Sequence, residues 1–145
     1  MAKNFFLSVV LILIVHIGFT QYVPKKKDIK NNNIQSITTW DYKYTYDNKG
    51  QPKETKYKSS YTKYYKNGEM LEETEYEPDG TIKNKKTYKY DSNENKTEEI
   101  TYNSDGSIKQ KETYKYNADG MRVEKRVLSP DGRLESGRKY EHTYY

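Results

Sequence analysis

The chain has 145 residues with a formal net charge of +5, and it contains no cysteine. This length suits one domain, and the lack of cysteine excludes both a disulfide scaffold and a lipid attached to a cleavage-site cysteine. The charge is mildly basic and spread over a very polar sequence, so we interpret it as a source of solubility and expect no nucleic-acid partner. If the charge does select a ligand, anionic glycans and lipid headgroups are the better candidates.

Residues 1–20 have the layout of a secretory signal peptide, which we expect to form an N-terminal signal helix. A positive charge at Lys3 precedes an apolar run of 15 residues, Phe5–Phe19, and small residues at Gly18 and Thr20 then precede a cleavage site. The alternative is an uncleaved membrane anchor, but the run is shorter than the roughly 20 residues that span a bilayer. The sequence therefore predicts a secreted protein, in the periplasm, at the cell surface or outside the cell, that meets the membrane only during export.

Residues 21–37 are expected to be a flexible linker. The stretch Tyr22–Ser36 has few apolar anchors, and it carries a run of lysines and a run of asparagines, a composition that is typical of solvated tethers. We interpret Lys25–Lys27 as part of this tether and not as a binding patch. The folded domain is therefore expected to begin at residue 38 and to continue to residue 145.

Most of the region 38–145 repeats with a period of 26 residues, although its N-terminal third is out of register with this period. Three sets of aligned positions carry the same chemistry, namely a tyrosine, an aliphatic residue and an aspartate–glycine pair. They are Tyr88, Tyr114 and Tyr140; Ile82, Ile108 and Leu134; and Gly80, Gly106 and Gly132, each after an aspartate. A period that is kept over three copies indicates a repeat architecture.

Within each copy the apolar and polar residues alternate, which predicts half-buried β-strands. In Thr81–Tyr90, for example, we expect Ile82, Tyr88 and Tyr90 on one face and polar residues on the other. The helical spacing of three and four residues is absent from the chain after the signal. About nine strands follow from this pattern: Thr38–Tyr46, Gln51–Lys58, Tyr61–Tyr65, Glu69–Tyr76, Thr81–Tyr90, Lys96–Tyr102, Ser107–Tyr116, Met121–Leu128 and Arg133–His142.

Turn residues separate the expected strands. The sequence EPDG at Glu77–Gly80 places proline at the second position of a type I turn and glycine at the left-handed residue. Where Glu94 replaces this glycine, we expect a neighbouring asparagine to take the left-handed conformation. Because Gly50 and Gly68 are only 18 residues apart, the hairpin expected around Ser59–Ser60 has to be short.

Tyrosine replaces aliphatic residues as the main material of the expected interior. The chain has 17 tyrosines, and a tyrosine can bury its ring while its hydroxyl stays hydrated, which suits a single sheet better than a two-sheet sandwich. We therefore predict an all-β fold, an antiparallel β-meander of tandem hairpins in one open, twisted or curled sheet. Tyrosines are expected on one face and charged residues on the other, with Glu72, Glu73 and Glu75 opposite Lys83, Lys85 and Lys86.

The stretch Tyr76–Gly120 resembles the YD-repeat, or RHS-type, proteins, in which a Tyr-x-Tyr-Asp turn alternates with an Asp-Gly turn along a β-meander. The best matches to the motif are YTYD at Tyr44–Asp47 and YKYD at Tyr88–Asp91. The sequence at Tyr64–Tyr76 also resembles the MORN-variant repeats of some bacterial toxin–antitoxin components. The resemblance covers residues 38–145 and implies a secreted, Bacteroidota-type protein. About three copies are too few for the closed shell of large YD-repeat proteins, so we expect no shell.

No set of residues predicts an enzyme, a cofactor or a metal site. His142 is the one histidine after the signal, and it holds a position that is tyrosine in other copies, so neither a nucleophile–histidine pair nor a zinc site is expected. The turn aspartates offer one carboxylate each, whereas calcium needs six or more oxygens. Four glutamates recur at the repeat spacing, which favours a structural role over paired-carboxylate catalysis: Glu72, Glu73, Glu98 and Glu99.

Two functional hypotheses follow. The favoured one is a structural or protein-interaction module with an unknown protein partner, associated with a toxin or its immunity protein as the resemblance implies. The alternative is a glycan-binding module whose exposed aromatic rings contact an extended sugar polymer. The alternative predicts exposed rings at five positions: Trp40, Tyr42, Tyr44, Tyr88 and Tyr114.

Overall fold

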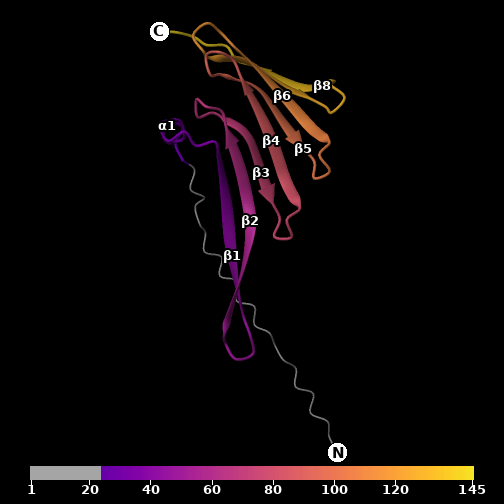
Figure 1. Cartoon of the computed structure of the whole chain (residues 1–145). Helices are drawn as coiled ribbons and strands as arrows, with labels where there is room; N and C mark the ends of the chain where they lie inside the picture. Colours follow the sequence, from indigo (N-terminus) through magenta and orange to yellow (C-terminus); the bar gives the residue numbers. More distant parts are fainter. Residues whose placement is uncertain (1–23) are drawn as a thin grey trace, which may run out of the picture.

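The computed structural model describes residues 24–145, which form one helix and eight strands (Figure 1). The helix α1 spans Lys26–Asn31, and the strands are β1 (Ser36–Tyr46), β2 (Pro52–Tyr64), β3 (Met70–Tyr76), β4 (Ile82–Tyr90), β5 (Lys96–Tyr102), β6 (Ile108–Tyr116), β7 (Arg122–Leu128) and β8 (Leu134–Lys139). They form one sheet in the order β1 to β8, and each strand pairs antiparallel with the next. This confirms the expected open all-β meander. The signal peptide expected at residues 1–20 lies outside the described residues.

Seven turns with one hydrogen-bond pattern join the strands. In the turn Glu77–Gly80, the Gly80 N–H donates to the Glu77 carbonyl and the Glu77 N–H donates to the Thr81 carbonyl, both at 2.9 Å. Gly80 has a φ of +86°, a left-handed conformation that a side chain disfavours. The same two bonds recur in all seven turns, so the repeated aspartate–glycine sequences predicted the turn geometry correctly.

Glu94 takes the left-handed conformation itself, with a φ of +64°, so the prediction of an asparagine at this place is wrong. Its carboxylate accepts hydrogen bonds from Lys26 at 2.7 Å and from Asn67 at 3.1 Å. The Asp91 carboxylate further fixes the turn by accepting two backbone N–H bonds at 2.9 Å. These contacts offset the backbone strain, which costs about 1–2 kcal/mol for a residue with a side chain.

Strand β2 is continuous over 13 residues, so the hairpin predicted at its two serines is wrong. Thr39 of β1 pairs with Ser60. The next residue, Trp40, pairs with Lys58, which leaves Ser59 as an extra residue in a β-bulge. Such an insertion interrupts the alternation of a strand without ending it. Eight strands therefore form in place of the expected nine.

Each of the other six hairpins has a bulge at the second residue of its later strand. In the β3–β4 hairpin Tyr76 pairs with Ile82, and Lys83 is the extra residue before regular pairing resumes. One inserted residue reverses the alternation, so Ile82 lies on the face of Tyr76. The prediction that Ile82 shares a face with Tyr88 and Tyr90 is therefore wrong.

The interior of the sheet is thin and centres on two tyrosines at matching positions of successive copies. Tyr88 in β4 is 9% exposed and Tyr114 in β6 is 7% exposed. Lys96 of β5 lies between them, with its ammonium 5.4 Å and 5.0 Å from the two ring centres. Both hydroxyls donate to carboxylates, Tyr88 to Glu73 at 3.2 Å and Tyr114 to Glu112. Two tyrosines therefore lie in the interior. The prediction that tyrosines and charged residues occupy opposite faces is wrong, because Tyr88 pairs directly with Glu99 and Tyr114 with Lys125.

Lysine–glutamate pairs link neighbouring strands. Lys85 of β4 contacts Glu72 of β3 at 3.3 Å, as expected, whereas Lys83 contacts the turn residue Glu77 at 3.6 Å. The bulge at Lys83 turns this side chain away from the strand ladder, which accounts for the change of partner. Each exposed pair contributes at most about 1 kcal/mol.

The structure differs from the expected flexible linker at residues 26–31, which form α1. Ile29 is 1% exposed, and the helix lies against the turn between β2 and β3, where Gly68 approaches the Lys26 carbonyl. One isoleucine among lysines and asparagines gives no helical periodicity, so the sequence contains little signal for this helix.

The buried tyrosines predict a loss of stability at alkaline pH. Burial, together with nearby glutamates, raises the pKa of Tyr88, and burial with the hydrogen bond to Glu112 raises the pKa of Tyr114. Below about pH 10 both the folded and the unfolded chain keep these protons, whereas above about pH 10 only the unfolded chain ionises. The free energy of unfolding is therefore expected to fall as the pH rises above about 10, as measured by urea unfolding at a series of pH values.

Replacing both tyrosines with phenylalanine provides the control for this pH dependence. The variant lacks the two hydroxyls, so its stability is expected to fall less steeply above about pH 10 than that of the unchanged chain. An equally steep fall in both proteins would show that other groups cause the alkaline loss.

Candidate functional site

The β1–β2 hairpin extends beyond the rest of the sheet (Figure 1). β2 pairs with β3 only from Ser60 to Tyr64, whereas β1 and β2 pair with each other as far as Tyr46 and Pro52. Among residues 24–145, the part of this hairpin from Trp40 to Lys58 therefore has two strands and no third strand beside them. We call this part the arm.

Local sequence explains why the arm is a regular hairpin. The Asp47 carboxylate accepts the backbone N–H groups of Lys49 and Gln51, each at 2.8 Å, and Gly50 takes the left-handed position of the turn with a φ of +74°. Pro52 pairs with Tyr46, at a position where the ladder requires no N–H toward β1. The arm therefore has a well-defined turn at its tip.

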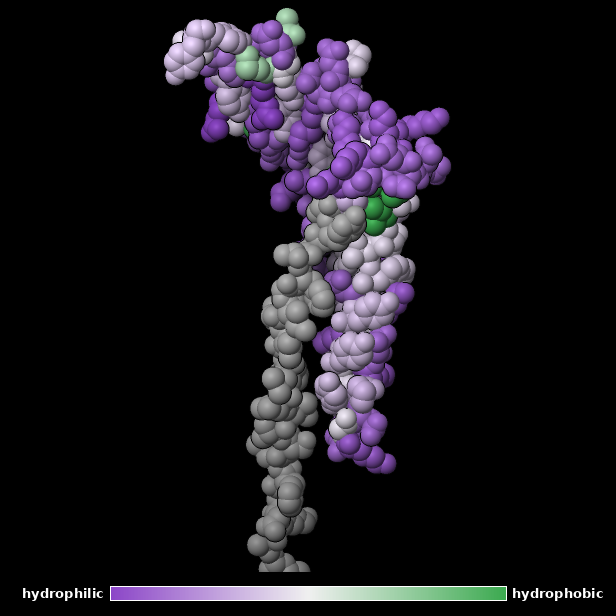
Figure 2. Space-filling model, turned by 90° about the vertical axis from the view of Figure 1, so that its left-hand side faces the viewer, coloured by the Kyte–Doolittle hydropathy of each residue, from purple (hydrophilic) through white to green (hydrophobic). Residues whose placement is uncertain are grey.

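Four aromatic residues lie at alternate positions of β1 and share one face of the arm. Trp40 is 47% exposed, Tyr42 52%, Tyr44 55% and Tyr46 70%. We call them the aromatic row. The arm forms the pale column in the lower part of Figure 2, next to more polar surface. No other strand of the described residues combines so many exposed rings.

Charged side chains of β2 contact the aromatic row. The ammonium of Lys56 lies 4.7 Å from the ring centre of Trp40 and 5.6 Å from that of Tyr42. The Tyr44 hydroxyl donates to the Glu54 carboxylate at 2.5 Å, and this hydrogen bond raises the pKa of Tyr44. The row is thus held in order by its neighbours, while each ring keeps about half or more of its surface open to solvent.

The opposite face of the arm is polar. On β1 it carries Asp41, Lys43 and Thr45, which pair with Tyr57, Thr55 and Lys53 of β2. The ion pairs of the described residues involve neither Asp41 nor Lys43. This face therefore carries one ring, Tyr57, whereas the other face carries the four rings of the row.

The structure separates the five residues that the glycan hypothesis named. Trp40, Tyr42 and Tyr44 are exposed together in the arm, whereas Tyr88 and Tyr114 are buried in the sheet. The prediction of exposed rings at the last two positions is therefore wrong, because both strands that carry them have a neighbour on each side.

Sequence reasoning missed the arm itself and the fourth ring, Tyr46, although a signal for both is present. After Gly68 the left-handed turn residues follow one another every 12 or 14 residues, whereas Gly50 and Gly68 are 18 residues apart. The longer interval gives the first hairpin residues that β3 cannot cover. The continued alternation after Tyr44 then places Tyr46 on the same face.

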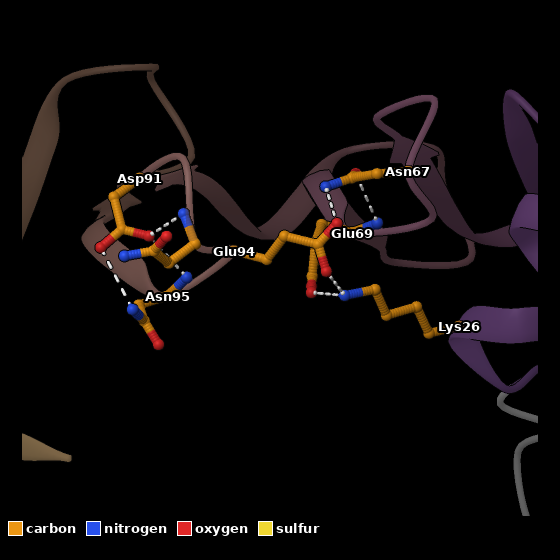
Figure 3. A network of polar contacts seen from close by, with 7 residues as sticks. Lys26, Asn67, Glu69, Asp91, Glu94 and Asn95 are labelled. Carbon is orange, nitrogen blue, oxygen red and sulfur yellow. Dashed lines mark hydrogen bonds and ion pairs between the residues drawn. The ribbon is translucent and has the colours of Figure 1, made fainter. Parts of the chain in front are cut away.

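A second cluster of polar side chains connects α1 with two turns (Figure 3). Lys26 contacts Glu69 and also Glu94, the latter at 2.7 Å. Hydrogen bonds to these carboxylates raise the pKa of Lys26, and those from Lys26 and Asn67 lower the pKa of Glu94. Because these groups satisfy one another, the cluster fixes α1 to the sheet and is not a candidate binding site.

The remaining chemistry-bearing residues of the described chain form no obvious site. Among residues 24–145 there is no group of three or more histidine, cysteine or acidic side chains arranged to hold a metal ion. Strand β8 ends at Lys139, three residues before the strand end expected at His142. His142 therefore follows the strand, and its Nε2 lies 3.0 Å from the Arg122 carbonyl oxygen. No helix in this part of the chain is long and apolar enough to cross a bilayer.

No family model matches the sequence, and no curated protein matches it. The resemblance to YD-repeat and MORN-variant proteins therefore stays a prediction. Among the described residues, the arm with its aromatic row is the candidate functional site.

Proposed function

We propose that the protein is a secreted, non-enzymatic interaction module that binds a partner protein through the aromatic row of its arm. The observation that supports this proposal is the row itself, four neighbouring rings of which the least exposed is 47% exposed. Tryptophan and tyrosine are the residue types that most often dominate the energy of protein interfaces.

The position of the row is better suited to binding a partner than to stabilising the fold. Within the described part of the chain the arm has no third strand, so there the rings of Trp40, Tyr42 and Tyr44 cover no interior. Burying a large apolar side chain stabilises by about 1.5–3 kcal/mol, and in this fold that energy is available only when a partner covers the row. A contiguous apolar surface of this kind is typical of an interaction site.

The contacts of the row favour a protein over a glycan. A sugar ring binds by stacking on an open aromatic face, but the ammonium of Lys56 already lies over the rings of Trp40 and Tyr42, at 4.7 Å and 5.6 Å. A protein surface can contact ring edges and hydroxyls as well as faces. The arm also has five lysines and three acidic residues, so we propose a partner surface with an acidic rim.

The role of the partner follows from the resemblance and not from the arm. We propose that the partner is a toxin-associated or immunity-type protein encoded near this chain, and that the two meet outside the cytoplasm. The apolar start of the sequence, with the layout of an export signal, supports this location.

Capture experiments with matched variants of the arm test this function. The purified protein is immobilised, exposed to the secreted and periplasmic fractions of its native host, and the bound proteins are identified by mass spectrometry. The double variant Trp40→Ala, Tyr44→Ala is expected to lose a specific protein that the unchanged chain retains, because two of the four rings of the row are gone. The control is Tyr57→Ala, which removes a ring from the opposite face of the same arm.

Two outcomes would contradict the proposal. Equal loss of binding with Tyr57→Ala would show that the aromatic row does not select the partner. Binding to a glycan array that disappears in the Trp40→Ala, Tyr44→Ala variant, without any captured protein that depends on the row, would instead establish the glycan-binding function.

A further inference from the structure

The outer edge of β1 carries backbone groups that the sheet does not use. β1 is the first strand in the sheet order, so within residues 24–145 its outer edge has no strand partner. The Asp47 N–H donates to the Gln51 carbonyl at the tip of the arm. Since hydrogen bonding alternates along an antiparallel pair, Asp41 and Lys43 direct their backbone groups toward β2, and Tyr42 directs its N–H and carbonyl outward.

The sequence of β1 is complementary to itself when read in the opposite direction. In an antiparallel pair of two β1 strands centred on Tyr42, each Tyr42 faces the other, and Asp41 lies opposite Lys43 of the second copy. Trp40 then lies opposite Tyr44, and Thr39 lies opposite Thr45. Such a pair combines two opposite-charge contacts with a ladder of aromatic contacts, and both kinds of cross-strand pair are stabilising.

Other registers lack this complementarity. The two strands can form hydrogen bonds only if residues whose backbone N–H and carbonyl point outward lie opposite each other. These residues alternate along β1, so the centre of the pair must fall on a residue and not between two residues. A register centred on Asp41 places two aspartates opposite each other, and one centred on Lys43 places two lysines opposite each other. Like charges that face each other directly destabilise a strand pair. Of the three registers around the middle of the arm, only the one centred on Tyr42 joins Asp41 with Lys43.

We propose that two copies of this chain form a symmetric dimer by antiparallel pairing of their β1 strands around Tyr42. The axis is perpendicular to the sheet, so the dimer is a continuous sheet of two arms and two meanders. Exposed edge strands pair readily with other strands, and strand addition of this kind is a common mode of protein recognition. Asp41 and Lys43 take part in none of the ion pairs of the described chain, so they are available for the second copy.

The dimer does not rest on the proposed function, because it uses the edge of the arm and leaves the face with the aromatic row uncovered. It would place the rows of two copies side by side and so enlarge the surface that a partner meets. The charge variants below leave all four rings in place, so failure of the dimer and failure of partner binding can be observed separately.

Sedimentation equilibrium with charge variants tests the proposal. In a dimer of the Lys43→Asp variant, an aspartate faces an aspartate at both contacts. In a dimer of the Asp41→Lys variant, a lysine faces a lysine at both contacts. Each variant alone is therefore expected to dimerise at least about tenfold more weakly than the unchanged chain. In an equimolar mixture of the two variants every facing pair is again of opposite charge. The mixture is therefore expected to form a heterodimer about as strong as the original dimer.

A backbone variant tests the same edge independently of charge. Tyr42→Pro removes the outward N–H at the centre of the pair but no hydrogen bond to β2, and proline is tolerated on edge strands. It is expected to be monomeric, with a circular dichroism spectrum that matches the unchanged chain.

Three results would overturn the proposal. They are a monomeric unchanged chain at the highest attainable concentration, a dimer that persists in both charge variants, and a mixture that associates no better than its components. Association through the apolar residues near the N-terminus would produce the second result, since the charge changes do not affect those residues.

Discussion

Replacing Tyr114 with alanine is expected to lower the free energy of unfolding by about 3 kcal/mol, at the lower end of the range for buried aromatic residues. The ring is 7% exposed and is surrounded by three cationic side chains, with Lys96 at 5.0 Å, Arg122 at 4.8 Å and Lys125 at 5.9 Å from its centre. The sheet has a single layer, so water can enter the space that the ring leaves, which keeps the loss below that of a deep core. Urea unfolding followed by circular dichroism measures the change.

Two further variants separate the causes of this loss. Tyr114→Phe keeps the ring and removes only the hydroxyl that donates to Glu112, so it is expected to cost about 1 kcal/mol. Tyr42→Ala makes the same truncation at a ring that is 52% exposed, and its cost is expected to stay within about 0.5 kcal/mol. Equal losses for Tyr114→Ala and Tyr42→Ala would show that burial of Tyr114 does not hold the sheet together.

Replacing Gly68 with alanine is expected to cost about 3 kcal/mol, for two reasons that act together. The residue has a φ of +88°, and a side chain in this conformation costs about 1–2 kcal/mol. The new Cβ would also lie 2.6 Å from the Lys26 backbone oxygen, which forces α1 away from the sheet. Exposure of Ile29, now 1% exposed, then removes a further 1.5–3 kcal/mol, about the value of one buried aliphatic side chain.

Gly80 provides a matched control for this substitution. Its φ of +86° is nearly the same, but a Cβ at Gly80 would meet no atom within 4 Å. Gly80→Ala is therefore expected to cost only the conformational part, about 1–2 kcal/mol. Urea unfolding compares the two variants, and equal losses would mean that α1 contributes nothing to stability through its contact with the turn.

The features that the sequence predicts well are those that depend on neighbouring residues. The turn at Glu77–Gly80 is specified by proline, aspartate and glycine within four positions, and the strand that follows is specified by alternation. The period of 26 residues extends this local information along the chain. Together they are sufficient to predict one open meander, because a strand that follows a tight turn pairs with the strand before it.

The features that the sequence did not predict depend on partners that are distant in the chain. Tyr42 and Tyr44 have the same Tyr-x-Tyr spacing as Tyr88 and Tyr90, yet Tyr42 is exposed and Tyr88 is buried. The difference arises because β4 lies between β3 and β5, whereas β1, which carries Tyr42, has only β2 beside it among residues 24–145. Burial of a tyrosine in a single-layer sheet is thus decided by the lengths of the neighbouring strands.

The bulges limit prediction in a different way. Ser59 and Lys83 are polar residues in polar surroundings, and nothing in their identity distinguishes an inserted residue from a regular strand position. Each one nevertheless reverses which side chains share a face. The predicted assignment of Ile82 to the face of Tyr88 is wrong for this reason, and so is the turn predicted at Ser59–Ser60.

Each strand of the described chain pairs only with its immediate neighbours in the sequence. Folding therefore requires no strand to wait for a segment that is made much later, and the loop-closure entropy of each step is that of one short turn. Such a chain can begin to fold at a single hairpin and then add one strand at a time, before the rest of the chain has been synthesised. Loss of the strand at either edge would make the sheet narrower without unfolding the other strands.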